Sequence, residues 1–207
     1  ARDLNAPVKK IRVFDFDDTL ARTKSKVGYT MPDGTTGKID AETFAKDAGT
    51  MEAEGVTWDF SEFSKVMDGK KGPLFEVAKK IQEVRGSEDI FVLTARPADA
   101  AGPIKEFLGS LGLDIPLKNI TGLGDGSPQA KAGWIVGKAA DGYNDFYFTD
   151  DAIGNVKAVK EALSVLDVKS KVQQAKIQFS KTIDKEFNEI IENKTGIAAQ
   201  KNYAKVK

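Results

Sequence analysis

Short apolar runs alternate with segments of helical periodicity along most of this chain. Residues 11–14, 90–93 and 145–149 read IRVF, IFVL and DFYFT, and short runs of this kind are typical of buried strands. Residues 73–85 instead repeat apolar side chains every three or four positions, between a proline and a glycine, as a helix does. A further strand is expected near 118–123, and further helices near 103–111, 129–140 and 154–163. Strands that alternate with helices predict an α/β domain on a parallel sheet.

Residues 24–68 interrupt this alternation. They contain a hairpin-like piece, VGYTMPDGTTGKID, with Asp33-Gly34 at its turn. A short helix near 41–48 and the aromatic stretch WDFSEF follow. We expect this segment to be a small flap, or cap, inserted over one end of the sheet.

The last part of the chain departs from the alternation as well. Residues 170–193 predict a helix, because apolar side chains recur there at spacings of three and four. These side chains are Val172, Ala175, Phe179, Ile183, Phe187 and Ile190. Residues 8–168 are thus expected to form the sheet domain, and residues 169–207 a C-terminal helical extension. Its apolar stripe either packs onto the domain or binds a second copy or a protein partner.

The residue types that are missing narrow the chemistry. The chain has no Cys and no His, which excludes thiol nucleophiles, thiolate metal sites, His-dependent triads and ordinary zinc sites. Its 31 acidic and 31 basic residues balance, so it has no general attraction to nucleic acid or to an anionic membrane. No apolar run approaches the ~18 residues of a membrane span, and the N-terminus does not read as a secretory signal. We expect a cytoplasmic protein without a membrane partner.

The strongest chemical signal is the segment DFDDTL, which directly follows the first predicted strand. Asp15 and Asp17 stand two residues apart in it, so on an extended chain their carboxylates point to the same side. Open α/β sheets bind ligands at the carboxyl ends of their strands. This placement favours a functional site over the local capping of a turn.

This pair of carboxylates suits phosphoryl transfer. Asp15 can attack phosphorus and form an aspartyl-phosphate, while Asp17 protonates the leaving oxygen and later activates water. Two close carboxylates and a phosphate repel one another, so a cation is needed. Mg²⁺ fits a site that consists of oxygen atoms with few protein ligands.

DFDDTL resembles the first motif of the haloacid-dehalogenase-like hydrolase superfamily, and the family's other motifs have counterparts further along. Thr94, in FVLTAR, is similar to the second motif, whose hydroxyl binds the phosphoryl group; the alternative is a cap of the strand end. Arg96 either belongs to this motif or pairs with a surface acid. Lys131, in GSPQAKAGWIV, matches the third motif, a lysine that neutralises the nucleophile and the phosphate. Lys118 and Lys138 are rivals for that position.

The fourth family motif is an acidic pair after a strand, and FYFTDD ends in such a pair. The resemblance implies that Asp150 ligates Mg²⁺ and that Asp151 ligates it or holds its water; for Asp150 the alternative is a helix N-cap. Asn155 stands four residues further on. By the same resemblance Asp15 is also a ligand of the metal, whereas Asp17 contributes only its backbone carbonyl.

The resemblance covers about residues 11–168 and implies a three-layer Rossmann-like fold with phosphomonoester hydrolase activity. Family members that cleave carbon–halogen bonds or pump ions typically lack the second acid, so Asp17 points to phosphatase or phosphomutase chemistry. Members also use the segment after the first motif as a flap or cap, and residues 24–68 are similar in placement. Because this segment is short for a full cap domain, we expect a fairly open site and a large substrate.

The sequence leaves the substrate open among nucleotides, nucleic-acid ends, sugar phosphates and phosphoproteins. The spacing of LTAR and DD resembles the 3′-phosphatase half of polynucleotide end-healing enzymes, but the neutral charge does not favour nucleic acid. The chain also resembles phage-encoded members of the family. The second interpretation is therefore an assembly module that docks through residues 170–193, for example as a virion component, with the virion as its location.

Overall fold

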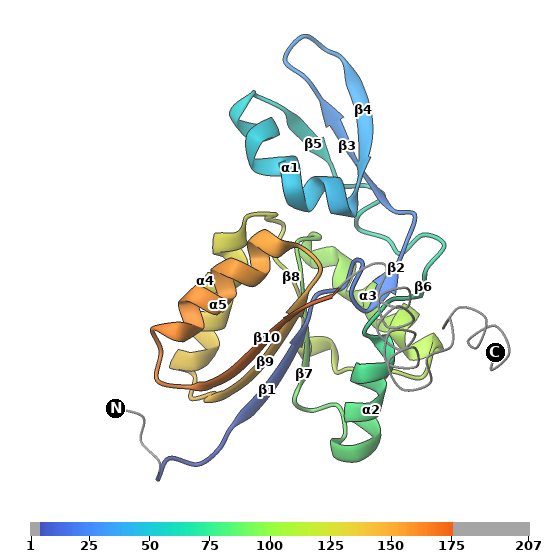
Figure 1. Cartoon of the computed structure of the whole chain (residues 1–207). Coiled ribbons are helices and arrows are strands. Elements are labelled where there is room, and N and C mark those ends of the chain that lie inside the picture. Colours follow the sequence, from blue (N-terminus) through green and yellow to red (C-terminus); the bar gives the residue numbers. More distant parts are fainter. Residues whose placement is uncertain (1–4, 176–207) are drawn as a thin grey trace, which may run out of the picture.

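The computed structural model describes residues 5–175, and its centre is a five-stranded parallel sheet (Figure 1). In spatial order the strands are β10 (Lys169–Gln174), β9 (Asp145–Asp150), β1 (Lys10–Phe14), β7 (Ile90–Thr94) and β8 (Ile120–Gly122). The order grows outward from β1, first through β7 to β8 and then through β9 to β10. The predicted α/β class with a parallel sheet is confirmed, and the layout is compatible with a Rossmann-like fold.

Helices cover both faces of this sheet. They are α2 (Phe75–Arg85), α3 (Ala101–Ser110), α4 (Pro128–Ala140) and α5 (Ile153–Ser164), with short 3₁₀ turns η1 (Ala98–Ala100) and η2 (Leu117–Asn119) before α3 and β8. Successive side chains of a strand point to opposite faces, so Phe14 joins the core under α2 and α3, and Val13 joins the core under α4 and α5. The burial of both faces explains why β7 contains a continuous apolar run and why β1 and β9 carry apolar side chains on both faces. Within residues 5–175, no helix is both long and apolar enough to cross a membrane.

The segment between β1 and α2 forms a small unit above the carboxyl edge of the main sheet (Figure 1). It contains β3 (Lys26–Thr30), β4 (Thr36–Asp40), α1 (Ala41–Ala53) and β5 (Thr57–Asp59), and β2 (Ala21–Arg22) pairs with β6 (Lys70–Lys71) at its base. The hairpin turn lies at Asp33-Gly34 as predicted, and Gly34 has the left-handed φ of 89° that a tight turn uses. Phe44 and Phe63 centre a small core of this unit. We call residues 24–68 the flap.

The predicted start of the C-terminal helix is wrong. Residues 169–174 form the edge strand β10, which pairs with β9 along its whole length and completes the sheet. Val172 and Ala175 would share one face of a helix. On an extended chain, residues three positions apart point to opposite faces of the sheet, so Val172 packs against the core under α4 and α5 and Ala175 joins the core under α2 and α3. The remainder of the predicted segment 170–193, from residue 176 on, lies outside the described residues.

Candidate active site

Three neighbouring strands of the main sheet end in polar side chains. Asp15 directly follows β1, Thr94 closes β7 and Asp150 closes β9. The backbone N–H of Asp15 donates to the carbonyl of Thr149 at 2.9 Å, which holds the start of this loop against β9. The strand order grows away from β1 on both sides, and open α/β sheets bind ligands where the order reverses in this way. These three side chains and Lys131, which are assigned to separate motifs of the sequence, line one small cavity.

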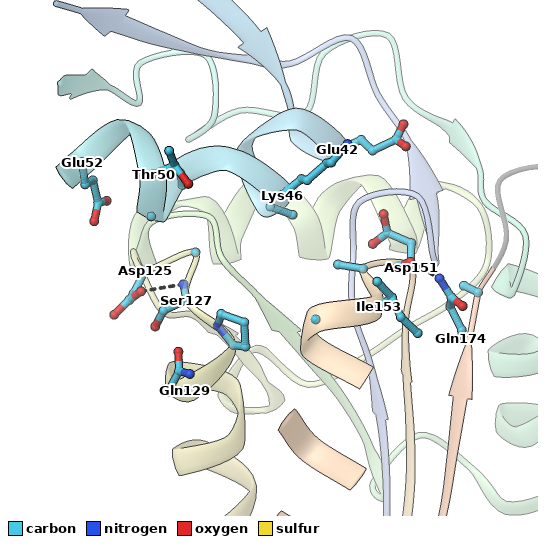
Figure 2. Close-up of a pocket in the computed structure, with 18 residues that line it drawn as sticks. Glu42, Lys46, Thr50, Glu52, Asp125, Ser127, Gln129, Asp151, Ile153 and Gln174 are labelled. Carbon is cyan, nitrogen blue, oxygen red and sulfur yellow. Dashed lines mark hydrogen bonds between the residues drawn. The ribbon is translucent and has the colours of Figure 1, made fainter. Parts of the chain in front are cut away.

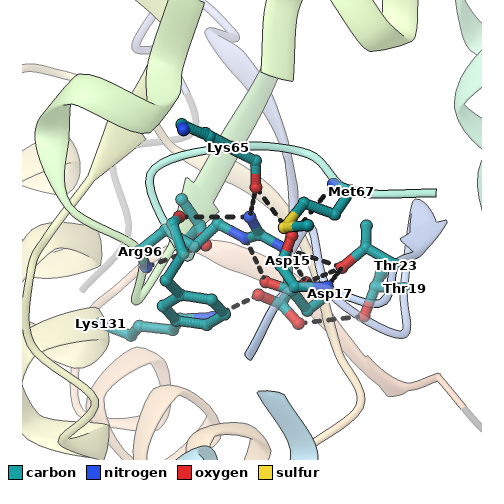
Figure 3. A network of polar contacts seen from close by, with 11 residues as sticks. Asp15, Asp17, Thr19, Thr23, Lys65, Met67, Arg96 and Lys131 are labelled. Carbon is teal, nitrogen blue, oxygen red and sulfur yellow. Dashed lines mark hydrogen bonds and ion pairs between the residues drawn. The ribbon is translucent and has the colours of Figure 1, made fainter. Parts of the chain in front are cut away.

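Lys131 lies buried between the acids of β1 and β9. Its Nζ is 2.8 Å from Oδ1 of Asp15 (Figure 3) and 2.6 Å from Oδ2 of Asp150. The side chain comes from the first turns of α4, which begins after the N-cap residue Ser127. Burial disfavours the charged ammonium, but the attraction of Asp15 and Asp150 outweighs this effect, so the pKa of Lys131 is raised. The ammonium therefore stays charged and bridges the two strand ends.

The two rival lysines lie away from these acids. Nζ of Lys118 is exposed and 4.0 Å from Glu88. Nζ of Lys138 lies over the ring of Trp134, 5.0 Å from its centroid. Of the three candidates, Lys131 is the one that reaches the strand ends.

Asp15, Asp150 and Asp151 form a cluster of carboxyl groups, with one oxygen atom of each within 4.8 Å of the others. Burial, and then repulsion from Asp150, raises the pKa of Asp15 to about 7. Burial, and then the charge of Asp15, raises the pKa of Asp151 to about 11. Lys131 supplies one positive charge against three acidic side chains, so one cation does not neutralise the cluster when all three are ionised. Such a cluster can hold a metal ion.

Asn155 on α5 adds an unpaired oxygen to the same cavity. Its Nδ2 donates to Oδ2 of Asp150 at 3.1 Å. Its Oδ1 is the one buried side-chain nitrogen or oxygen atom within residues 5–175 that has no hydrogen-bond partner. A buried acceptor without a donor is costly, whereas the water shell of a cation offers donors. Carboxylates beside a free amide oxygen fit a hard divalent ion, although they do not single out one metal.

Two threonine hydroxyls lie close to the nucleophile candidate. Oγ1 of Thr19 donates to Oδ2 of Asp15 at 3.3 Å, so Thr19 and Lys131 each hold one oxygen of this carboxylate (Figure 3). Oγ1 of Thr94 accepts from the backbone N–H of Arg96 at 3.1 Å. Thr94 thus caps its strand end and also lines the cavity. No role is predicted for Thr19 from the sequence, although its place inside the DFDDTL motif is a signal that it lies at the site.

Asp17 lines the same cavity, but its carboxylate turns to Arg96 (Figure 3). Nε of Arg96 lies 2.8 Å from Oδ2 of Asp17, and Nη2 lies 2.7 Å from Oδ1, which makes a bidentate ion pair. Arg96 is fully buried, so the alternative that it pairs with a surface acid is wrong. The Asp17 carboxylate lies outside the three-acid cluster. A metal contact of Asp17 through its backbone carbonyl stays a prediction.

Arg96 also connects the flap to the loop after β1. Its Nη1 donates to the backbone carbonyls of Phe63, at 3.2 Å, and of Lys65, and both residues belong to the flap. Its Nη2 also donates to Oγ1 of Thr23 at 2.9 Å. The guanidinium lies over the rings of Phe16 and Phe63, 5.2 and 4.5 Å from their centroids. One side chain therefore holds Asp17, the loop and the flap together.

Two aromatic residues of the flap help to line the cavity at the acid cluster. Phe44 and Phe63 line the cavity together with Asp15, and its volume is about 20 Å³. A space of that size holds about one water molecule. Asp151 also lines a much larger groove, so the acid cluster has an open side, and the expectation of a fairly open site stays a prediction.

A larger groove adjoins this cavity (Figure 2). Its volume is about 1030 Å³, and it runs between α1 and the N-terminal ends of α4 and α5. Asp151 lines both the groove and the cavity. A ligand whose phosphate sits near the acid cluster can therefore extend into the groove.

The chain matches no model of a known protein family, and no curated protein matches it either. The resemblance to the haloacid-dehalogenase-like superfamily comes from four short motifs and stays a prediction.

Proposed function

We propose that this protein is a magnesium-dependent phosphomonoester hydrolase of the haloacid-dehalogenase-like type. One observation carries the proposal: the Lys131 ammonium bonds both Asp15 and Asp150, and a third carboxyl lies within 4.8 Å. A structural ion pair would be complete with a single acid. One lysine among three acids at the strand ends suits a phosphoryl group that arrives together with a divalent cation.

We assign Mg²⁺ to the cluster of Asp15, Asp150 and Asp151, with the backbone carbonyl of Asp17 as a further ligand. When bound, the ion supplies the positive charge that lets a phosphate approach these carboxylates. The free Oδ1 of Asn155 would accept a hydrogen bond from the ion's water. Oxygen donors favour Mg²⁺ or a similar hard ion, and the chain has no Cys or His to offer a softer metal.

Asp15 is the proposed nucleophile. One of its carboxylate oxygens bonds to phosphorus while the bond from phosphorus to the leaving oxygen breaks, which yields an aspartyl-phosphate. For this step Asp17 first takes up a proton from solvent, which weakens its ion pair with Arg96, and then gives that proton to the leaving oxygen, so the product departs as a neutral alcohol. Lys131 and Thr19 hold the Asp15 carboxylate in place for the attack.

Asp17 then acts as the base of the second step. It takes a proton from a water molecule, whose oxygen bonds to phosphorus as the bond from phosphorus to Asp15 breaks. Inorganic phosphate leaves, and both aspartates return to the states in which they entered the first step. Arg96 keeps the Asp17 carboxylate at the wall of the cavity. A cytoplasmic location for this activity stays a prediction, with the virion as the alternative.

Hydrolysis of p-nitrophenyl phosphate tests the proposal. The wild-type chain should release p-nitrophenolate with Mg²⁺, stop with EDTA and recover when Mg²⁺ is restored. Asp15→Asn should lose at least about a thousandfold in kcat, because an amide cannot form the acyl-phosphate. Asp145→Asn is the matched control: Asp145 is also a buried acid, at the opposite end of β9, and its variant should keep turnover. Equal turnover in Asp15→Asn and wild type would falsify the assignment.

A further inference from the structure

The groove beside the acid cluster has walls of mostly one charge (Figure 2). Glu42 and Glu52 come from α1, Asp125 comes from the loop before α4, and Asp151 is shared with the cavity. Lys46 is the single basic residue among the described residues that line the groove. A ligand with a second phosphate or carboxylate would therefore meet net repulsion there.

The groove also lacks the groups that hold bases and nucleic-acid backbones. None of the 18 residues described as lining it is Phe, Tyr or Trp. Proteins bind single-stranded nucleic acids by stacking bases on aromatic rings and by placing basic residues along the backbone. Neither feature is present in the described lining, so nucleotides and nucleic-acid ends fit this groove poorly.

The polar side chains of the groove match hydroxyl groups instead. Carboxylates such as Glu42 accept hydrogen bonds, while Thr50 and Gln129 both donate and accept. Each hydroxyl of a sugar likewise donates one hydrogen bond and accepts others. The volume of about 1030 Å³ is at the upper end of the usual range for small-molecule pockets and leaves room for more than one sugar ring.

We propose that this groove binds the leaving group of the substrate, and that the leaving group is an uncharged, hydroxyl-rich sugar or polyol. The inference rests on the proposed function, because the phosphoryl group is placed at the acid cluster and the groove begins at Asp151. The substrate is then a sugar monophosphate. Nucleotides, bisphosphates and phosphorylated nucleic-acid ends are poor substrates.

Steady-state kinetics with the full chain and Mg²⁺ tests this choice. The substrates are p-nitrophenyl phosphate, maltose 1-phosphate, fructose 1,6-bisphosphate, adenosine 5′-monophosphate and a 3′-phosphorylated oligothymidylate. We expect kcat/KM for maltose 1-phosphate to exceed those for the last three by at least about tenfold. An equal or higher value for any of these three overturns the inference, while p-nitrophenyl phosphate reports on the proposed function. No hydrolysis of p-nitrophenyl phosphate overturns both.

A charge reversal inside the groove tests where the leaving group lies. Glu42→Lys should raise the ratio of kcat/KM for fructose 1,6-bisphosphate to that for maltose 1-phosphate by about fivefold, since repulsion becomes attraction. Glu76→Lys is the matched control: Glu76 holds the same second position, in α2, is exposed and does not line the groove. Its variant should leave the ratio unchanged.

Glu52→Lys, near the other end of α1, is the second groove variant in case Glu42→Lys does not fold. It should shift the ratio in the same direction. Circular dichroism establishes that each variant is folded. A ratio that stays constant in a folded groove variant, or that moves equally in Glu76→Lys, overturns the placement of the leaving group.

Discussion

Negative charge is balanced unevenly among the residues of the site. Asp17 has its own partner in Arg96, whereas Asp15 and Asp150 share Lys131, and Asp151 lies beside these two acids. The pKa values of Asp15 and Asp151 are raised, mainly by burial, so protons take up part of the excess charge when no cation is bound. A divalent ion would replace these protons, and its binding would add to the free energy of unfolding.

Mg²⁺ should therefore stabilise the folded protein. At ten times its dissociation constant it would add about 1.4 kcal/mol to the free energy of unfolding. Asp150→Asn should abolish this gain because it removes a carboxylate of the cluster, whereas Asp145→Asn, at the other end of β9, should retain it. Thermal unfolding with Mg²⁺ and with EDTA measures the difference. A full gain in Asp150→Asn would place the ion elsewhere.

Removal of Arg96 should be costly, because it leaves the largely buried Asp17 carboxylate without its partner. We expect Arg96→Met to lower the free energy of unfolding by about 3–5 kcal/mol. Arg85→Met is the control, since Arg85 pairs with Asp89 on the surface and such a pair contributes under about 1 kcal/mol. Urea unfolding compares the two variants. Equal losses of unfolding free energy in Arg96→Met and Arg85→Met would show that the buried Arg96–Asp17 pair does not stabilise the fold more than a surface pair does.

Much of the site follows from local sequence, and part of it does not. The ends of three apolar runs supply Asp15, Thr94 and Asp150, and the carboxyl ends of parallel strands meet at one edge of the sheet. Lys131 needed the family resemblance, because a lysine near a helix start is usually exposed. The role of Arg96 could not be predicted, because its partner lies 79 positions away and its other contacts come from the flap.

Among the elements, helix α1 matters most for access, because it lines the groove and carries Phe44 into the cavity. The helix begins at its N-cap residue Asp40, whose Oδ1 accepts from the backbone N–H of Thr43 at 2.8 Å. This hydrogen bond lowers the pKa of Asp40. At a pH above the pKa of an unfolded aspartate, about 3.9, the cap therefore stabilises the flap fully. This stabilisation is lost as the pH falls through the lowered pKa of Asp40 in the folded protein.

Asp40→Ala should lower the free energy of unfolding by about 1 kcal/mol at pH 7. The difference from wild type should shrink below about pH 4, where the unfolded chain takes up a proton at Asp40, and should vanish as the pH falls through the lowered pKa of the folded carboxylate. Asp40→Asn is the control, since asparagine caps helices about as well at either pH. Denaturant unfolding at pH 7 and pH 3 gives the comparison, and a cost that grows toward low pH contradicts the capping account.

Strand β10 shows why apolar patterns predict central strands better than edge strands. β1, β7 and β9 carry apolar side chains on both faces, and each contains at least three apolar residues. β10, KSKVQQ, pairs on one side only and carries one apolar residue, which is too little to reveal a period. The apolar residues that follow it in the sequence then suggested a longer helix.

At the level of the whole molecule, the sheet needs the chain as far as Ala175, which is buried in the core under α2 and α3. A truncation after Ala175 should stay folded and keep hydrolase activity, because every proposed site residue is retained. A truncation after Val168 removes β10 and should lose cooperative unfolding. Circular dichroism and the activity assay distinguish the two. Activity in the shorter chain equal to that of the longer one would contradict this boundary.

The same truncation after Ala175 tests the predicted docking role of the segment 170–193. If that role lies beyond β10, the truncated chain should differ from the full chain in its oligomeric state. Light scattering of both chains measures this. An unchanged mass would remove self-association and leave a foreign partner as the remaining form of the prediction.

The covalent intermediate offers the most direct test of the proposed chemistry. In Asp17→Asn, p-nitrophenyl phosphate should still phosphorylate Asp15, since p-nitrophenolate leaves without a proton, but the hydrolysis step lacks its base. Mass spectrometry after acid quenching should then find a phosphoryl group on the peptide that contains Asp15, and none in Asp15→Asn. Turnover by the wild-type chain with no phosphoryl group on that peptide in Asp17→Asn would contradict catalysis through Asp15.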